Sequence, residues 1–456
     1  MPTSAVGILL LGAHMFGNLK KLFGKGEDKP ASASAVLPAR IDAAGSGQMP
    51  FLRREAVFDR NHRLSGHLFY LQDSSPLADA EPSRQGEMDQ ALIETLNASP
   101  EAWNTSRAYI PVNSASLGLS ALDRLKTDNV VLLIQLAPDA EADRVGEAIE
   151  QLNERGIHIG LFRQPKHPAF GKVIQLVDYA AIDIAGNDAN AARDFSAAVR
   201  TAGHARGHQL LACNVETLDD HRFCQQWHYD HFHGKFASDP GSPASDSAGD
   251  PHKAQLLNLM RLVQGEAEIP DIAAAMKQDP LLSFRILRYL NSPALGLTHR
   301  IESLEQALII LGRQRLTRWL AVLLFSVRDP HFGDWLLIEN ALTRGRLMEV
   351  LGVQSMPGQS HDPLFLTGIF SLLDRLLRRP LVEILDDIPI ADSIRQALLD
   401  QEGPYAPLLA LAKASEDFDL QRMGTTALAA GVDPQSVNRA LLAATAWASE
   451  VTGYWE

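Results

Sequence analysis

Strand-like and helix-like patterns alternate along residues 50–237, and the strand pattern then stops. Between these limits lie eight short apolar runs with strand character, many separated by helical patterns such as residues 143–156. This order predicts a parallel α/β barrel with some short or missing outer helices, and an open doubly wound sheet is the alternative. The strands are expected at Glu55–Phe58, Leu64–Leu71, Ala108–Asn113, Val130–Leu136, Ile157–Phe162, Ala180–Ile184, Gln209–Cys213 and Tyr229–His233.

The second half of the sequence carries helical patterns only. Asp279 is a good N-cap and is followed by Pro280 at the first helical position. Ser303 and Gln306 have the spacing of a capping box, and Gly312 predicts the stop of that helix. Residues 253–456 are therefore expected to form an all-α domain.

Two polar stretches rich in small residues, proline and glycine divide the chain at residues 24–49 and 237–252. They give a flexible N-terminal segment at 1–49, a barrel at 50–237, a linker at 238–252 and a helical domain at 253–456. The sequence leaves open whether translation starts at Met1 or Met15.

Charge and cysteine content narrow the expected location and partners. The net charge of −13 argues against nucleic acid or an anionic membrane as a partner. The only cysteines, Cys213 and Cys224, fit a reducing cytoplasm. Since no apolar run reaches the roughly 18 to 20 residues that span a bilayer, no transmembrane segment is expected.

The helical half resembles the HDOD domain, a signalling relative of the HD-type phosphohydrolases. The resemblance covers most of residues 253–420. It is carried by the motifs "QDPLLSFRILRYLNSPALGL", "RIESLEQALIILGRQRLTRWL" and "LTGIFSLLDRLL".

The first half is similar to the EAL domain, a barrel that hydrolyses cyclic di-GMP with two divalent cations. This resemblance lies in the strand frame, and EAL followed by HDOD is a recurring arrangement of bacterial signalling proteins. The motifs are "FDRNHRLSGHLFYLQ", "YIPVNSASL", "VVLLIQL", "RGIHIGLFRQP", "AIDIAG", "LLACNVET" and "FHGKF".

The resemblance implies that the metal site of the barrel has been lost. Hard cations need anionic and carbonyl oxygens. The acidic and lysine positions of the EAL site fall instead on Leu68, Leu133, Phe162, Arg163, Ala181 and Cys213. The motif arginine falls near Gln72, and the late glutamine falls on His233. Three matching residues remain as vestiges with an expected structural role: Asn113, Asp183 and Glu216.

The helical half lacks the His-Asp pair of its catalytic relatives. That pair falls on Ser371 and Leu372, and the upstream histidine falls near Asn340. A literal His361–Asp362 does occur. Because Pro363 follows, Asp362 is expected to be a helix N-cap and not a metal ligand.

Other clusters leave alternatives open. A zinc site could use Cys224, His228, His231 and His233, but their spacing matches no common zinc motif. A metal-free, histidine-rich barrel mouth is preferred. Arg313, Arg315 and Arg318 predict either a basic interaction face or a solvated helix start that anchors Trp319 and Leu320 in the core.

The helical domain is expected to fold independently and to recognise a partner. A loop between two capped helices predicts an interaction surface, with a core plug as the alternative. Its key residues are Leu295, Leu297, His299 and Arg300.

These features together predict a cytoplasmic, non-catalytic signal-transduction protein without a cofactor. By resemblance, it would act through protein–protein contacts in a cyclic di-GMP or two-component network, and it is not expected to bind cyclic di-GMP. Residual cyclic di-GMP phosphodiesterase or HD-type phosphohydrolase activity is one alternative. A small-molecule sensor that uses the barrel pocket is another.

Overall fold

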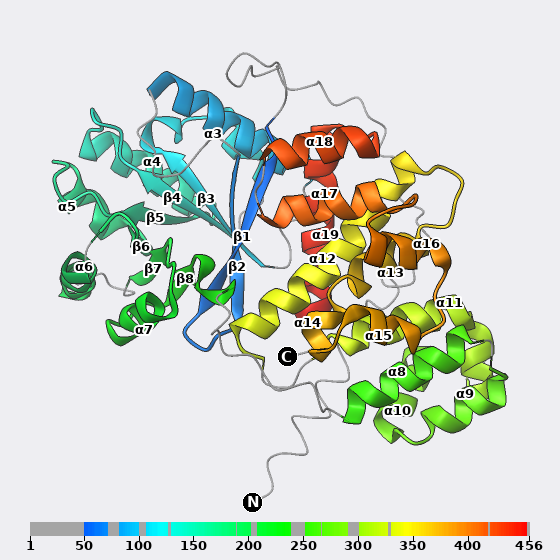
Figure 1. Ribbon diagram of the computed structural model, residues 1–456. Helices are drawn as coiled ribbons and strands as arrows, with labels where there is room; N and C mark the ends of the chain where they lie inside the picture. Colours follow the sequence, from blue (N-terminus) through cyan, green and yellow to red (C-terminus); the bar gives the residue numbers. More distant parts are fainter. Residues whose placement is uncertain are drawn as a thin grey trace, which may run out of the picture.

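The first half of the chain folds into a barrel (Figure 1). The computed structural model describes residues 50–71, 82–99, 106–125, 129–187, 189–201, 208–238, 251–265, 267–290, 301–326, 330–417 and 420–453. Within these residues eight strands close the barrel in chain order. Each predicted strand is present, and the open-sheet alternative is excluded. The strands are β1 (Leu52–Asp59), β2 (Leu64–Leu71), β3 (Arg107–Asn113), β4 (Val130–Gln135), β5 (His158–Phe162), β6 (Tyr179–Asp183), β7 (Gln209–Cys213) and β8 (His231–His233).

Strand β1 departs from the predicted parallel arrangement. It pairs antiparallel with both β2 and β8, whereas β2 to β8 pair in parallel. The cause is the short connection between β1 and β2, residues 60–63. A parallel connection needs a crossover of roughly a dozen residues or more, so this segment forms a hairpin. The prediction of an all-parallel barrel is corrected at this strand.

The outer layer of the barrel is uneven, as its small size predicted. Two short 3-10 segments replace a helix between β3 and β4, and α5 has four residues. Helix α4 ends at Glu154, and Gly156 two residues later has the φ of 83° expected of the predicted cap glycine. The outer elements are α3 (Pro82–Asn97), η2 (Ser114–Ser116), η3 (Ser120–Arg124), α4 (Ala142–Glu154), α5 (Phe170–Val173), η4 (Ile174–Leu176), α6 (Ala189–Thr201), α7 (Leu218–Gln226) and η5 (Lys235–Ser238).

The second half is helical throughout its described residues, and the predicted helix signals hold. Asp279 caps α10, because its Oδ1 accepts the Leu282 amide at 2.9 Å. Ser303 caps α11 in the same way, and Gly312 interrupts that helix with a φ of 75°. The helices are α8 (Pro251–Gln264), α9 (Ile269–Met276), α10 (Pro280–Leu290), α11 (Leu304–Leu324), α12 (Phe332–Ser355), α13 (Asp362–Phe370), α14 (Leu373–Leu377), α15 (Leu381–Asp386), α16 (Asp392–Arg395), the π-helical η7 (Gln396–Asp400), α17 (Ala406–Asp417), α18 (Leu420–Ala430) and α19 (Pro434–Gly453).

The outer face of β1 and β2 packs against the helical half. Figure 1 shows these two strands on the side of the barrel that faces α12 and α19. Phe58 and Phe69 share a buried cluster with Phe332, Trp335 and Leu442 of those helices. The hairpin leaves no room for a barrel helix here, so helices from the other domain cover this face.

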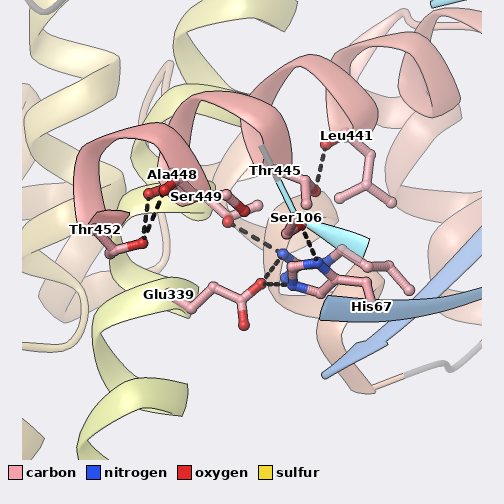
Figure 2. Close-up of polar contacts among 10 residues, drawn as sticks. His67, Ser106, Glu339, Leu441, Thr445, Ala448, Ser449 and Thr452 are labelled. Carbon is pink, nitrogen blue, oxygen red and sulfur yellow. Dashed lines mark hydrogen bonds and ion pairs between the residues drawn. The ribbon is translucent and has the colours of Figure 1, made fainter. Parts of the chain in front are cut away.

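Buried polar groups also join the two halves. The Asn438 side chain on α19 accepts the Leu52 amide at 2.8 Å and donates to the Pro50 carbonyl at 3.1 Å. Glu339 on α12 pairs with the Arg54 guanidinium. It also contacts the His67 ring, as Figure 2 shows. This shared core argues against the expectation that the helical half folds independently.

Among the residues that the structure describes, none forms a helix that is both long and apolar enough to cross a membrane.

Candidate functional site

One cluster of buried side chains fills the interior of the barrel. Leu68, Leu133, Phe162, Ala181 and Cys213 all belong to it. These residues lie on different strands. They meet because alternate side chains of each barrel strand point inward. These are positions where the EAL resemblance expects metal ligands and a lysine. The positions do lie close together, but their side chains are apolar or, at Cys213, a thiol. Burial raises the pKa of the Cys213 thiol, so it stays protonated. The other members are Val57, Tyr70, Tyr109, Val131, Tyr179 and Leu211.

Arg163 lies at the rim beside this cluster. Its guanidinium donates to Asn187 Oδ1 at 2.8 Å, in the loop after β6. Its backbone amide donates to the Ala181 carbonyl at 2.8 Å. Of the two positions that matched the paired aspartates, Phe162 is therefore the one that fills the barrel interior. The Arg163 guanidinium thus pairs with Asn187 and does not belong to the buried cluster.

The three vestigial residues are held by local contacts. Asn113 Oδ1 accepts the Ala115 amide at 2.9 Å and caps η2. Asp183 Oδ1 accepts from the Asn214 side chain at 3.0 Å and from the Ala185 amide at 3.1 Å. The half-exposed Glu216 carboxylate lies 3.8 Å from the Lys235 amine. Such contacts fit the expected structural role.

A charged group on β1 was missed by the sequence analysis. The Glu55 carboxylate pairs with His233 of β8 and with Arg53. Burial alone would raise the pKa of Glu55, but the His233 hydrogen bond and the nearby positive charges lower it to about 2. The signal was the alternation in "RREAV", which puts Arg53 and Glu55 on the same face of the strand. This carboxylate is already compensated within the protein.

The proposed zinc ligands are dispersed. His231 uses both ring nitrogens, with Ser65 Oγ at 3.1 Å and Gln209 Oε1 at 2.8 Å. Burial, aided by Arg107, lowers its pKa to about 4, so the ring is neutral near pH 7. His231 and His233 are both buried in the short strand β8, where period-2 alternation gives them one face as predicted.

The remaining proposed zinc ligands lie elsewhere. Cys224 belongs to the outer core, and His228 is exposed. Across the part of the chain that the structure describes, no cluster of three or more His, Cys, Asp or Glu residues is arranged to hold a metal ion.

The helical half places an arginine beside the position of the missing HD histidine. Ser371 Oγ accepts from Arg344 Nη1 at 2.5 Å and donates to the Gly368 carbonyl at 2.6 Å. Arg344 also makes a bidentate pair with Glu416, at 2.8 and 2.6 Å. Leu372, the other HD position, is buried in the core. The sequence analysis missed this pair, although Arg344 lies one helical turn after Asn340.

His361 and Asp362 lie at the start of α13, and Asp362 contacts a neighbouring helix. Asp362 is the first residue of α13, and His361 holds the cap position, so the predicted N-cap shifts by one residue. The Asp362 carboxylate accepts from Arg318 at 3.1 Å. Arg318 also pairs with Glu349 and stacks on the Phe365 ring, 3.7 Å from its centroid.

Arg318 is 5 % exposed and cannot belong to the proposed interaction face. Arg313 and Arg315 are exposed, while Trp319 and Leu320 are buried as the structural alternative predicted. Four proposed interface residues and the motif-arginine position lie outside the described residues. These are Leu295, Leu297, His299, Arg300 and Gln72.

Comparison with known families and proteins supports the domain order. The HDOD domain family matches residues 252–331. The chain is 26% identical over 312 residues to the cyclic di-GMP phosphodiesterase CdgJ of Vibrio cholerae, covering 68% of this chain and 71% of that protein. It is 25% identical over 374 residues to the uncharacterized protein YuxH of Bacillus subtilis, covering 80% of this chain and 90% of that protein.

Solved structures resemble the chain at lower identity. The cyclic di-GMP complex of the PaMucR phosphodiesterase has 15% identity and a TM-score of 0.34, covering 41% of this chain and 95% of that one. The YkuI protein of Bacillus subtilis, which has an EAL domain, has 12% identity and a TM-score of 0.34, covering 53% of this chain and 72% of that one. The observed barrel and the HDOD family match that follows it confirm the predicted domain order.

Proposed function

We propose that this chain, which joins an eight-stranded barrel to an HDOD domain, is a non-catalytic signal-transduction protein. It would act through protein–protein contacts in a cyclic di-GMP or two-component network. The observation that carries the proposal is the buried cluster of Leu68, Leu133, Phe162, Ala181 and Cys213 inside the barrel. The name of the Vibrio cholerae relative supports the cyclic di-GMP context.

The chemistry of the interior argues against a two-metal phosphodiesterase. Two divalent cations carry four positive charges and need several anionic oxygens at one place. The Glu55 carboxylate lies next to His233 and Arg53, which already compensate its charge. A metal-free mode of binding cyclic di-GMP is not expected either, because Phe162 and Leu133 fill the same interior.

The position of the HD metal site in the helical half also argues against catalysis. In the helical half, Arg344 lies beside Ser371 and is neutralised by Glu416. A metal ion at the Ser371 position would face the guanidinium directly, and their charges would repel. A folded domain without ligands for its ancestral metal would work through its surface.

Residual phosphodiesterase activity is the competing function, and the named relative favours it. Both functions are tested with the purified full-length chain, cyclic di-GMP and Mg²⁺ or Mn²⁺, with products separated by chromatography. We expect no metal-dependent hydrolysis above a buffer control. Hydrolysis that depends on metal and disappears in the Asn113→Ala variant would overturn the proposal, because a contaminating enzyme would not respond to that substitution.

A further inference from the structure

Histidines from both halves of the chain meet where the β1–β2 hairpin packs on the start of α12. His62 lies in the hairpin turn, and His331 holds the cap position of α12. Their Nδ1 atoms are 3.3 Å apart. His221 of α7 completes the group, with its ring centroid 6.2 Å from that of His62 and 5.0 Å from that of Phe332. We name these three histidines the seam histidines.

The contact between His62 and His331 requires a particular protonation state. A hydrogen bond between two Nδ1 atoms needs a proton on one ring and a free lone pair on the other. When both rings are imidazolium, both Nδ1 atoms carry protons and the rings repel each other. The contact between the two halves of the chain therefore depends on at least one neutral ring.

His221 adds a second sensitive position. Its ring stacks on Phe236 with centroids 4.6 Å apart and an interplanar angle of 11°. It is 3% exposed, and among the described residues its Nε2 finds no hydrogen-bond partner. A proton placed there would bring a charge into an aromatic cluster that offers it no acceptor.

We infer that the seam between the barrel and the helical half is a proton-sensitive contact that loosens at mildly acidic pH. Protonation of the seam histidines would separate the hairpin from the start of α12. This inference goes beyond the proposed function and does not depend on whether the barrel is catalytically active.

The direction of the pH effect follows from the pKa values. Burial and the charge of His331 lower the pKa of His62, and burial and the charge of His62 lower that of His221 to about 4. The closed seam therefore binds fewer protons than an open one, so its stability falls as pH decreases below about 6.5. If opening fully exposes His221, its shift alone allows up to about a 30-fold rise in opening at pH 5.

The neighbouring charged groups do not reverse this direction. Asp59 on the hairpin opposes the lowering of the His62 pKa, but its influence is weaker than that of burial or of His331, and its carboxylate also accepts the Asn61 amide at 2.8 Å. Arg222 on α7 further lowers the pKa of His221. On α12, Asp334 accepts the His331 amide at 3.1 Å and so holds the backbone of the cap.

Charged groups further along the same face complete the set. On the hairpin, Arg60 donates to the Gln225 carbonyl, and Arg63 carries a fixed positive charge. Glu339, beside Arg54 and His67, has a pKa of about 2 and stays charged throughout this range.

Hydrogen exchange of the full chain tests the inference. Amide protection in β1, β2 and the first turns of α12 is measured at about pH 7.5 and about pH 5, after correction for the intrinsic pH dependence of exchange. We expect protection at the seam to fall about tenfold or more at the lower pH. Far-UV circular dichroism should remain unchanged.

The His62→Asn/His331→Asn variant separates this mechanism from general acid sensitivity. Asparagine tolerates the φ of 64° at residue 62 and is a good N-cap at residue 331. The variant should lose the part of the pH response that depends on His62 and His331, and His221→Phe added to it should remove the remainder. His158→Asn on β5, away from the seam, should respond like the natural protein. Protection that does not change with pH, or a full response in the variant that lacks all three seam histidines, would refute the inference.

Discussion

At the scale of single residues, a buried carboxylate is important for the stability of this structure. Glu339 is 2% exposed and is balanced by Arg54 and His67 from the other half of the chain. Burial alone would raise its pKa, but the Arg54 charge and the His67 ring lower it to about 2. Its contribution to stability is therefore present above the unfolded pKa of 4.5 and is lost only as pH falls toward 2.

Removal of this carboxylate should be strongly destabilising. Glu339→Ala leaves the Arg54 guanidinium buried without its partner, and we expect a loss of about 3–5 kcal/mol in the free energy of unfolding. Glu383→Ala is the matched control, since its pair with Arg379 is exposed and contributes less than about 1 kcal/mol. Urea denaturation of both variants measures the difference. Equal losses would show that the buried cluster is not important for stability.

Site residues could be predicted from sequence only where a family pattern marked them. The convergence of Leu68, Leu133 and Phe162 followed from strand alternation and the EAL frame. The pair of Arg344 and Glu416 did not, because these residues are 72 positions apart and only the packing of α12 on α17 brings them together.

At the scale of single elements, glycine conformation offers a clean comparison. Gly312 interrupts α11 with a φ of 75°, whereas Gly86 lies inside α3, and a Cβ added at either site would meet nothing within 4 Å. The two sites therefore differ in backbone conformation and not in available space.

We expect alanine to have opposite effects at these two positions. Gly312→Ala should destabilise the protein by about 1 kcal/mol or more, because an L side chain is strained at this φ. Gly86→Ala should stabilise it by about 0.5–1 kcal/mol through helix propensity. Thermal unfolding of the two variants gives the signs, and a stabilising effect at residue 312 would contradict the observed kink.

Local signals explain why most elements were predictable. The caps at Asp279 and Ser303 and the stop at Gly312 each depend on a few neighbouring residues. The direction of β1 was missed because it depends on the length of the following connection, which the strand pattern itself does not contain. The N-cap of α13 is His361 and not the predicted Asp362, because the local sequence pattern does not fix the first helical residue.

At the scale of the molecule, the shared core should make the two halves unfold together. Phe332, Trp335 and Leu442 pack into the barrel cluster, and Asn438 bonds to the backbone of β1. Differential scanning calorimetry at neutral pH should therefore show one transition for the full chain. Two well-separated transitions would show that the halves are thermodynamically independent, as the sequence analysis expected.

The outer face of β1 and β2 is covered by helices from the second half of the chain. The order of synthesis therefore determines when the barrel is complete. The Leu52 amide pairs with Asn438, 386 residues later in the chain. A nascent barrel leaves the ribosome with its first two strands uncovered on the outside, and it stays so until α19 has followed. N-terminal domains commonly fold first as the chain is made. Here the first domain must wait for the last helix, and a chaperone that shields apolar surface would act on it during that interval.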